Sequence, residues 1–322
     1  MSVDLRTIAR ARLAIEEAAR RHLYDPNVSM IGFGYKEKAG LLQEDRPAIR
    51  FHVARKLTPI QLEAAATRPI PGRFGEFETD VIESRYAPHW GANRGARSGR
   101  LPVLRGGASI STEWQQGRGT LGGLVADRAT GERMILSNWH VLVGDWGARP
   151  GQRILQPGRM DGGTARDAVA RLARDAIARN LDAAVASLTG ARPLINEQWG
   201  LGPVTGAAPA ALGRTVFKSG CSTEITFGRV TEIESILRMR YGRLTRLIGR
   251  VLVIEPRSPR ELVSSGGDSG AWWLDAATRQ AVALHFAGSD APERALAMQM
   301  PAVLDALGIE IVTAGRTTRR KE

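Results

Sequence analysis

The stretch Gly267-Asp268-Ser269-Gly270 decides the fold of this chain, because two earlier segments can complete it as a charge-relay site. Segment 137–142 reads Ser-Asn-Trp-His-Val-Leu, and segment 180–185 reads Asn-Leu-Asp-Ala-Ala-Val. A serine hydroxyl is a poor nucleophile at neutral pH, so it needs an adjacent base, and that base needs an orienting carboxylate. His140, Asp182 and Ser269 are therefore the candidate catalytic residues.

Each of these residues also has a plainer interpretation. His140 could be a core histidine at a strand end, and Ser269 could be an ordinary turn serine. Asp182 could cap the apolar run that follows it, and Asp175 is the nearest rival carboxylate. A Gly-x-Ser-Gly motif alone is weak evidence, since loops are rich in both residues. The combination of three motifs favours catalysis.

The chain order His140, Asp182, Ser269 resembles that of the trypsin-like serine peptidases. Segments 119–125 and 218–220, which read Gly-Thr-Leu-Gly-Gly-Leu-Val and Lys-Ser-Gly, resemble the bacterial members related to the plant narrow-leaf-type serine peptidases. Trp139 departs from that group, which more often has asparagine there. The resemblance implies a mostly β, chymotrypsin-like double antiparallel β-barrel. It also implies a serine endopeptidase that forms an acyl-enzyme.

The resemblance assigns further roles near the nucleophile. The N–H groups of Gly267 and Ser269 would form the oxyanion hole, and segment 283–288 would be the strand on which the substrate backbone docks. The residues that would line the primary pocket are Val263, Ser264, His285, Phe286, Ala287 and Gly288. His285 with Ser264 resembles a pair that binds an acidic side chain, whereas Val263 would suit a pocket for small apolar groups.

Asp268 raises the question of activation. In secreted relatives, the matching aspartate pairs with a new amino terminus that cleavage releases and so orders the oxyanion loop. A cut after Arg105 would place such a terminus here. The alternative is that Asp268 pairs with an internal arginine or with backbone donors.

Length and composition allow more than one domain. A chain of 322 residues with 43% hydrophobic residues can bury two cores. We predict a small α+β N-terminal domain over 1–86, a Gly/Arg-rich linker or clasp over 87–107, the double β-barrel over 108–312 and a basic tail over 313–322.

Local patterns predict the elements within these regions. Helices are expected at 4–24 and 58–66, and strands at 28–35, 48–53 and 77–82. Segment 301–308 resembles the terminal helix of the peptidase group named above, and the resemblance implies a helix there. Short strands punctuated by turns then recur at 121–126, 133–137, 153–156, 182–188, 215–218, 225–233, 252–255, 271–274 and 281–286. Two short strands are expected around Gly242. His140 and Asp182 fall in the first barrel and Ser269 in the second, so the site should lie between them.

The net charge of +12 resembles a nucleic-acid signal, but only five of the 45 basic residues are lysines. Arginine cluster 238–250 could be a solvated strand face or a patch for an acidic ligand. We consider nucleic acid an unlikely partner. No secretory signal, membrane-length apolar run or metal-ligand spacing is visible in the sequence. Cys221 is the single cysteine, and it is expected to be buried and structural.

These observations predict a cytoplasmic enzyme with no cofactor, no metal and no membrane partner, acting on a protein or peptide substrate. Latency until activation is one possibility. A catalytically silent protein that uses the same cleft to bind a partner is the alternative function. The N-terminal domain could be an inhibitor, a targeting module or a scaffold, and the sequence does not predict an oligomeric state.

Overall fold

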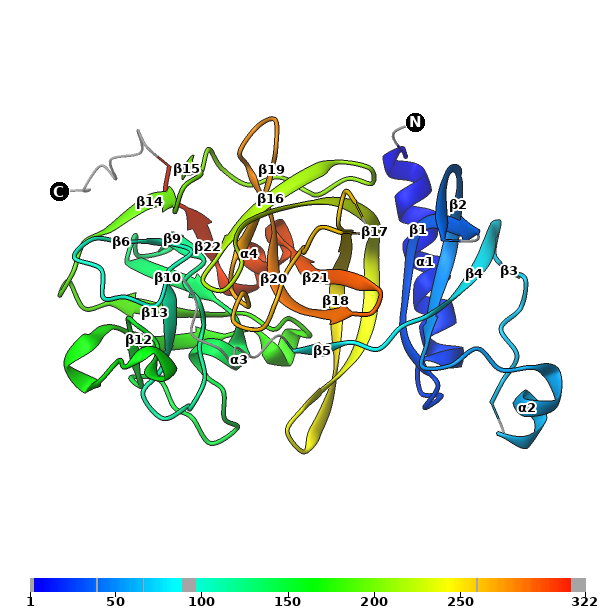
Figure 1. Cartoon of the computed structure of the whole chain (residues 1–322), viewed down its shortest axis with the longest axis horizontal. Coiled ribbons are helices and arrows are strands. Elements are labelled where there is room, and N and C mark those ends of the chain that lie inside the picture. Colours follow the sequence, from blue (N-terminus) through cyan, green and yellow to red (C-terminus); the bar gives the residue numbers. More distant parts are fainter. Residues whose placement is uncertain (1–2, 39, 66, 89–96, 259, 314–322) are drawn as a thin grey trace.

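The computed structural model describes residues 3–38, 40–65, 67–88, 97–258 and 260–313 (Figure 1). Residues 89–96 of the predicted linker, and the tail after 313, therefore lie outside the described residues. In the described part the chain is mostly β, with two barrels and an N-terminal α+β unit, which confirms the predicted fold class.

The second barrel contains the Ser269 segment and closes on itself. Its six strands pair in the order β16 (Thr215–Gly220), β19 (Trp272–Asp275), β20 (Ala281–Asp290), β21 (Glu293–Gln299), β18 (Leu244–Glu255) and β17 (Glu224–Tyr241). An additional pairing of β16 with β17 completes the ring. Each strand therefore has a neighbour on both sides, although β19 pairs with β20 only over Ala281–Leu284 and leaves the later part of that edge of β20 outside the ring.

The first barrel contains His140 and Asp182. Its strands pair in the order β22 (Ile309–Ile311), β9 (Gly123–Asp127), β10 (Arg133–Ser137), β13 (Ala184–Leu188), β12 (Ala168–Asp175), β11 (Arg153–Leu155), β7 (Ser109–Thr112) and β8 (Gly119–Thr120). Leu121 and Gly122 connect β8 directly to β9, and their N–H groups donate to Ala108 O (2.8 Å) and Leu136 O (3.1 Å), so this stretch bonds toward β7 on one side and β10 on the other. Helix α3 (Trp139–Leu142) follows β10, and α4 (Met300–Leu307) leads into β22.

A small three-stranded sheet lies beside the first barrel. Its strands are β15 (Gly202–Pro203), β14 (Leu194–Gln198) and β6 (Leu104–Gly106). Three 3₁₀ turns, η1 (Arg159–Asp161), η2 (Ala165–Asp167) and η3 (Ile177–Arg179), complete the loops of the barrel.

The N-terminal unit has the helix and strands that the sequence predicts. It consists of α1 (Leu5–His22), β1 (Val28–Lys38), β2 (Leu41–Val53), α2 (Pro59–Ala64), β3 (Arg73–Phe74) and β4 (Phe77–Glu83). Asp4 begins α1 by accepting a hydrogen bond from Thr7 N (2.9 Å), and Thr58 caps α2 in the same way. The buried face of α1, which includes Ala11 and Ile15, packs on β1, β2 and β17.

The N-terminal unit and the second barrel form one continuous sheet and one core. Strand β1 pairs antiparallel with β17, with Met30 opposite Leu237 and Phe33 opposite Ile233. Phe33 and Phe51 belong to the same buried cluster as barrel residues such as Leu252. The expectation of two short strands around Gly242 was wrong, since β17 has 18 residues and β18 has 12. The extra length lets β17 serve both the barrel and the N-terminal unit.

Buried charged side chains lie at this junction. His52 Nε2 lies 2.9 Å from Glu232 Oε2, and Arg50 Nη1 lies 3.6 Å from the same oxygen. Arg294 contacts Glu37 (3.2 Å) and Glu255 (2.9 Å). Burial, opposed by Glu232, lowers the pKa of His52, so this histidine is neutral at pH 7. The junction is therefore a buried network of paired charges, in which Arg50 contributes ion pairs longer than a hydrogen bond.

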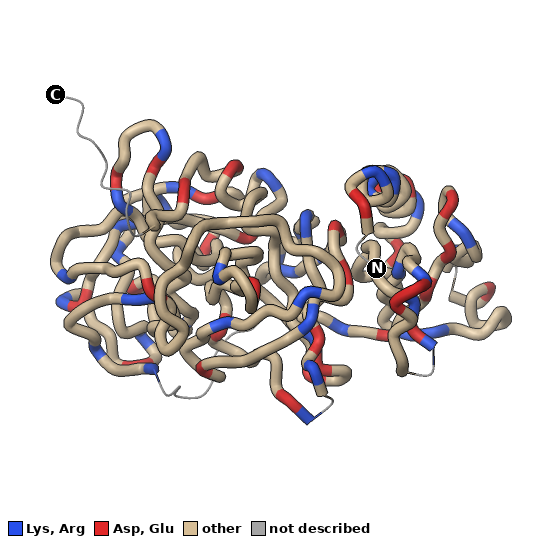
Figure 2. Tube along the Cα trace, turned by 90° about the horizontal axis from the view of Figure 1, so that it is seen from above, with Lys and Arg blue, Asp and Glu red and all other residues tan. Residues whose placement is uncertain are grey.

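Figure 2 shows basic and acidic positions interspersed along the trace. Many arginines are paired, for example Arg214 with Asp275 (2.8 Å) and Arg174 with Asp127 (2.6 Å). None of the helices in the described ranges is both long and apolar enough to cross a membrane.

Candidate active site

His140 and Asp182 are in direct contact between β10 and β13. His140 Nδ1 lies 2.6 Å from Asp182 Oδ2, and the His140 backbone N–H donates to Asp182 Oδ1 at 3.1 Å. Helix α3 presents His140 immediately after β10, and Asp182 stands two residues before the paired strand β13. The histidine is 2% exposed and the aspartate 0%. The carboxylate thus orients the imidazole through both its ring and its backbone.

Two more residues hold Asp182, and the sequence did not reveal either role. The Tyr241 hydroxyl donates to Asp182 Oδ2 at 2.7 Å, and the Asn138 side-chain amide donates to the Asp182 carbonyl at 2.7 Å. Burial, and next the Asp182 charge, raise the pKa of Tyr241 well above its ordinary value, so its hydroxyl stays a donor. Tyr241 lies at the end of β17, about sixty residues from Asp182 in sequence, so no local pattern could indicate the contact.

Ser269 is docked against the first barrel. Thr120 N donates to the Ser269 carbonyl at 2.7 Å, and the Thr120 carbonyl accepts a bond from Ser137 Oγ at 2.8 Å. Ser137 stands three residues before His140, so the nucleophile segment and the histidine helix share one support. Ser269 Oγ donates to the Phe286 carbonyl at 3.1 Å, and the residue is 0% exposed.

Two backbone carbonyls of the loop before Ser269 accept hydrogen bonds from neighbouring residues. The Gly266 carbonyl accepts from Ser222 Oγ at 2.6 Å, and the Asp268 carbonyl accepts from Ala271 N at 2.9 Å. In a trans peptide the N–H points opposite to the carbonyl, so the N–H groups of Gly267 and Ser269 point away from these partners. Gly267 has φ +99°, where a Cβ would meet Ser222 Oγ at 2.3 Å, so only glycine fits this turn. The N–H groups of such a loop are suited to donate hydrogen bonds to an anionic oxygen.

Asp268 is held by an internal lysine. Lys218 Nζ lies 2.8 Å from Asp268 Oδ2, with both side chains fully buried. Further bonds to the carboxylate come from the backbone N–H groups of Ser222 (3.0 Å), Thr223 (3.2 Å) and Ser265 (3.1 Å). Burial alone would raise the pKa of Asp268, but Lys218 and the hydrogen bonds outweigh it and lower the pKa to about 2. The predicted internal partner is thus a lysine rather than an arginine.

The proposed pocket residues before the nucleophile lie next to an acidic side chain, Glu293, which was not among the predicted site residues. The Val263 and Ser264 N–H groups donate to Glu293 Oε1 at 2.9 and 3.1 Å. Val263 is fully buried, and its carbonyl accepts from Thr226 Oγ1 at 2.7 Å. Burial is the main cause that raises the pKa of Glu293. Glu293 begins β21 after a turn, and its position next to Val263 and Ser264 arises only from the fold.

The pocket residues on β20 divide into two groups. His285 is buried in the ladder, since its N–H and carbonyl bond to Ala271 and Gly270 (2.9 Å each), and its ring lies 6.2 Å from that of Trp273. Phe286 presents its carbonyl to Ser269. Beyond Phe286, the edge formed by Ala287 and Gly288 pairs with β5 (Ala87–Pro88). The predicted substrate-docking strand thus carries a segment of this same chain.

Asp175 and Cys221 have structural contacts of their own. Asp175 is exposed, and its carboxylate caps η3 by accepting from Ile177 N at 3.0 Å. Cys221 is buried, and burial raises the pKa of its thiol to about 11, which agrees with a structural role. Among the described residues, no cluster of His, Cys, Asp and Glu could hold a metal ion.

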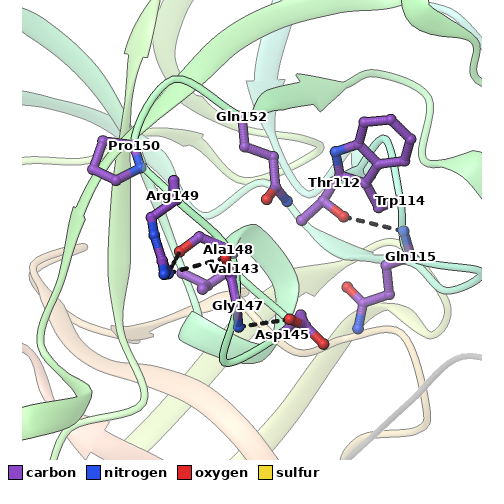
Figure 3. Close-up of a pocket in the computed structure, with 11 residues that line it drawn as sticks. Thr112, Trp114, Gln115, Val143, Asp145, Gly147, Ala148, Arg149, Pro150 and Gln152 are labelled. Atoms are coloured by element: carbon purple, nitrogen blue, oxygen red, sulfur yellow. Dashed lines mark hydrogen bonds between the residues drawn. The ribbon is translucent and has the colours of Figure 1, made fainter.

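Two cavities flank segment 143–147, which follows α3. Figure 3 shows the first, of about 600 Å³, which lies between β7 and this segment and is lined by Thr112, Trp114, Gln115 and Arg149. The second, of about 330 Å³, is lined by Pro88, Trp139, Trp146, Arg240, Tyr241 and Arg243. Trp139 stacks on Trp146 with ring centroids 4.5 Å apart, so its departure from the family pattern shapes this second cavity.

The comparisons with known proteins give matches in structure only. No protein-family model and no curated protein matches the chain. Similar solved structures include protease A of Thermobifida fusca (19% identity, TM-score 0.49, covering 66% of this chain and 100% of that chain). They also include a glutamic acid-specific serine protease (19%, TM-score 0.49, 65% and 100%) and the chymotrypsin of Cellulomonas bogoriensis (18%, TM-score 0.47, 66% and 100%).

The chain has a chymotrypsin-like fold. The order of the two barrels, with His140 and Asp182 on the first and Ser269 on the second, carries this conclusion. The relation to the plant narrow-leaf-type peptidases stays a prediction.

Replacing Tyr241 with phenylalanine is expected to lower kcat about tenfold, because the substitution removes one hydrogen bond to the Asp182 carboxylate and keeps the ring. KM should change little, since the hydroxyl bonds to the aspartate and the substitution keeps the ring. Steady-state hydrolysis of a peptide measures both constants, with Tyr24→Phe, at a position 76% exposed, as the control. An unchanged kcat would show that Tyr241 has no positioning role.

Proposed function

We propose that this protein is a serine endopeptidase that uses His140, Asp182 and Ser269. The observation that carries the proposal is the buried chain of contacts from Tyr241 through Asp182 to His140, next to the docked Ser269 segment. A structural histidine does not need an aspartate that contacts both its ring and its backbone. Such an arrangement instead suits a base that becomes cationic during a reaction.

The reaction follows from these positions. His140 Nε2 takes the Ser269 hydroxyl proton while Ser269 Oγ attacks the substrate carbonyl carbon, and Asp182 stabilises the resulting imidazolium. The N–H groups of Gly267 and Ser269 would bind the tetrahedral oxyanion, a contribution of about 10²–10³ in rate for each donor. The imidazolium then protonates the leaving amine, and the C–N bond breaks. Water, deprotonated by His140, hydrolyses the acyl-enzyme and restores Ser269.

Cleavage after Arg105 is not needed to order the oxyanion loop in this proposal. Lys218 already supplies the cation that a released amino terminus supplies elsewhere, and it lies 2.8 Å from Asp268. Arg105 itself lies within β6, which pairs with β14. The catalytic geometry would therefore be present in the uncut chain.

An acidic preference of the primary pocket is disfavoured. An acidic substrate side chain near Val263 and Ser264 would meet the Glu293 carboxyl, which accepts the N–H groups of both residues. Two like charges a few ångströms apart in a site of low dielectric constant repel each other by roughly several kcal/mol. We favour protein or peptide substrates with small or basic side chains at this position.

Labelling with a fluorophosphonate probe tests the proposal. The purified chain should gain one probe mass on Ser269, as measured by intact mass and peptide mapping, because only an activated serine reacts quickly. Ser269→Ala and heat-denatured protein should gain none. Labelling that persists in Ser269→Ala would exclude this serine as the nucleophile. If neither the parent chain nor a variant with a weakened strand β5 is labelled, the result would favour a silent binding protein.

A further inference from the structure

Strand β5 covers the edge of β20 beside the nucleophile. Ala87 lies opposite Gly288 and Pro88 opposite Ala287 in an antiparallel register. On the same strand, the neighbouring Phe286 carbonyl accepts the hydrogen bond from Ser269 Oγ at 3.1 Å. A free edge at this place would accept an extended peptide by backbone pairing. In this structure two residues of the chain itself take that place.

The direction of β5 is that of a peptide running toward the nucleophile. Because the pairing is antiparallel, the chain proceeds from Gly288 to Ala287 as it passes from Ala87 to Pro88, and so approaches Phe286. Ser269 is 0% exposed and His140 is 2% exposed. Both reacting side chains are therefore covered in the resting protein.

Pro88 also lines a cavity next to the candidate catalytic residues. It lines the cavity of about 330 Å³ together with Trp139 and Tyr241. These two aromatic residues adjoin the reacting groups, since Trp139 precedes His140 and Tyr241 bonds to Asp182. A substrate side chain that enters this cavity would compete with the proline ring. This contact is independent of the backbone pairing.

The chain before β5 is anchored to the buried junction. The Tyr86 hydroxyl lies 2.8 Å from His52 Nδ1, and Ser84 Oγ accepts from Arg294 Nη1 at 2.6 Å. Burial raises the pKa of Tyr86 to about 12, so its hydroxyl stays protonated and donates to the imidazole. The junction of the N-terminal unit and the second barrel thus holds the start of β5 in place. Figure 1 shows the chain that leaves β4 for the barrels.

From these contacts we propose that β5 is a built-in competitor that occupies the peptide-binding edge of β20. This inference rests on the proposed function, because it assigns an inhibitor to the same site. His140, Asp182 and the Lys218 ion pair are already in place, so inhibition acts by occupying the edge and not by disordering the loop. A substrate must displace two residues of β5. The expected kinetic signature is a raised KM for extended peptides.

The test weakens β5 without touching the catalytic residues. Pro88 has no N–H, so within β5 only Ala87 can donate to β20. Ala87→Pro removes that donor, while Ala87→Ser keeps it and serves as the matched control. We expect Ala87→Pro to lower KM for a peptide of eight or more residues about tenfold, the equilibrium shift that one backbone hydrogen bond gives. Ala87→Ser should behave as the parent chain.

Three measurements separate the possible outcomes. An unchanged KM in Ala87→Pro, in a chain whose Ser269 is labelled by the probe, would overturn the competitor role and leave the proposed function standing. Cleavage of the parent chain within residues 87–96, read by intact mass, would identify this segment as a substrate and would also overturn it. A fall in KM without such cleavage would support it.

The proposal can be tested even in a chain that shows no labelling. In the Ser269→Ala background, binding of the same peptide is followed by fluorescence anisotropy with and without Ala87→Pro. Peptide affinity that rises about tenfold supports the occupied edge independently of catalysis. Equal affinity in the two chains would overturn it. Circular dichroism confirms that each variant is folded.

Discussion

Asp182→Asn is expected to lower kcat about 10⁴-fold in a protein that remains folded. Asp182 accepts three hydrogen bonds from His140 N, His140 Nδ1 and Tyr241. An amide has one oxygen, and when that oxygen accepts from the His140 backbone, its NH₂ group faces Nδ1. The imidazole would then carry its proton on Nε2, where it cannot accept the proton of Ser269. Burst and steady-state kinetics with an active ester measure the loss.

Asp175→Asn is the matched control for this substitution. Asp175 is the carboxylate that competes with Asp182 on sequence alone, and in the structure it caps η3 on the surface. Its replacement should leave kcat within about a factor of two, as is usual for an exposed position. If Asp175→Asn lost the activity instead, the assignment of the two carboxylates would have to be exchanged.

Lys218→Met is expected to lower the free energy of unfolding by about 3–5 kcal/mol, because it leaves the buried Asp268 charge without its cation. Activity should fall with it, since Asp268 belongs to the loop whose N–H groups would bind the oxyanion. Urea unfolding followed by tryptophan fluorescence measures the stability. The probe-labelling rate, measured well below the unfolding midpoint, reports on the loop separately.

Two controls distinguish an unpaired buried charge from the loss of a lysine. Lys36 makes an ion pair of the same 2.8 Å length with Glu78, but both side chains are partly exposed, so Lys36→Met should cost less than about 1 kcal/mol. The double variant Lys218→Met, Asp268→Asn removes both charges and should recover part of the stability. A double variant as unstable as Lys218→Met would show that the charge is not the cause.

The pH dependence of stability follows from the lowered pKa of Asp268. Its folded-state pKa of about 2 lies below the ordinary value of 3.8. Asp268 therefore contributes stability that is fully present above pH 3.8 and is lost as the pH falls toward 2. Without Lys218, burial raises the folded-state pKa of Asp268 above 3.8, so the difference in unfolding free energy between the parent and Lys218→Met should begin to shrink at that raised pKa and keep shrinking until the pH approaches 2.

The fold class and the candidate site residues could both be proposed from the sequence, for different physical reasons. Catalytic residues must combine particular functional groups in a recognisable chain order, so His140, Asp182 and Ser269 could be chosen from short motifs. The structure places His140 and Asp182 in direct contact. Barrel strands could be predicted because turn residues separate short apolar runs.

Contacts between distant segments could not be predicted in this way. The stretch from Glu224 to Glu255 has the alternation of a strand, but alternation does not indicate that β17 pairs with both the barrel and β1. Tyr241 reaches Asp182 only because this long hairpin returns to the cleft. Lysine and arginine are equally plausible partners of Asp268 on charge alone, and the position of Lys218 on β16 decides between them.

By itself, the sequence determined the fold class and the candidate nucleophile with its base and carboxylate. These properties depend on residue type and local periodicity, which are encoded within a few neighbouring positions. Only the tertiary structure decided that β5 lies on the edge of β20, that Tyr241 supports Asp182 and that the N-terminal unit shares the barrel sheet. Each of these depends on which strand edges and buried polar groups meet across long loops, a choice that the whole packed core makes.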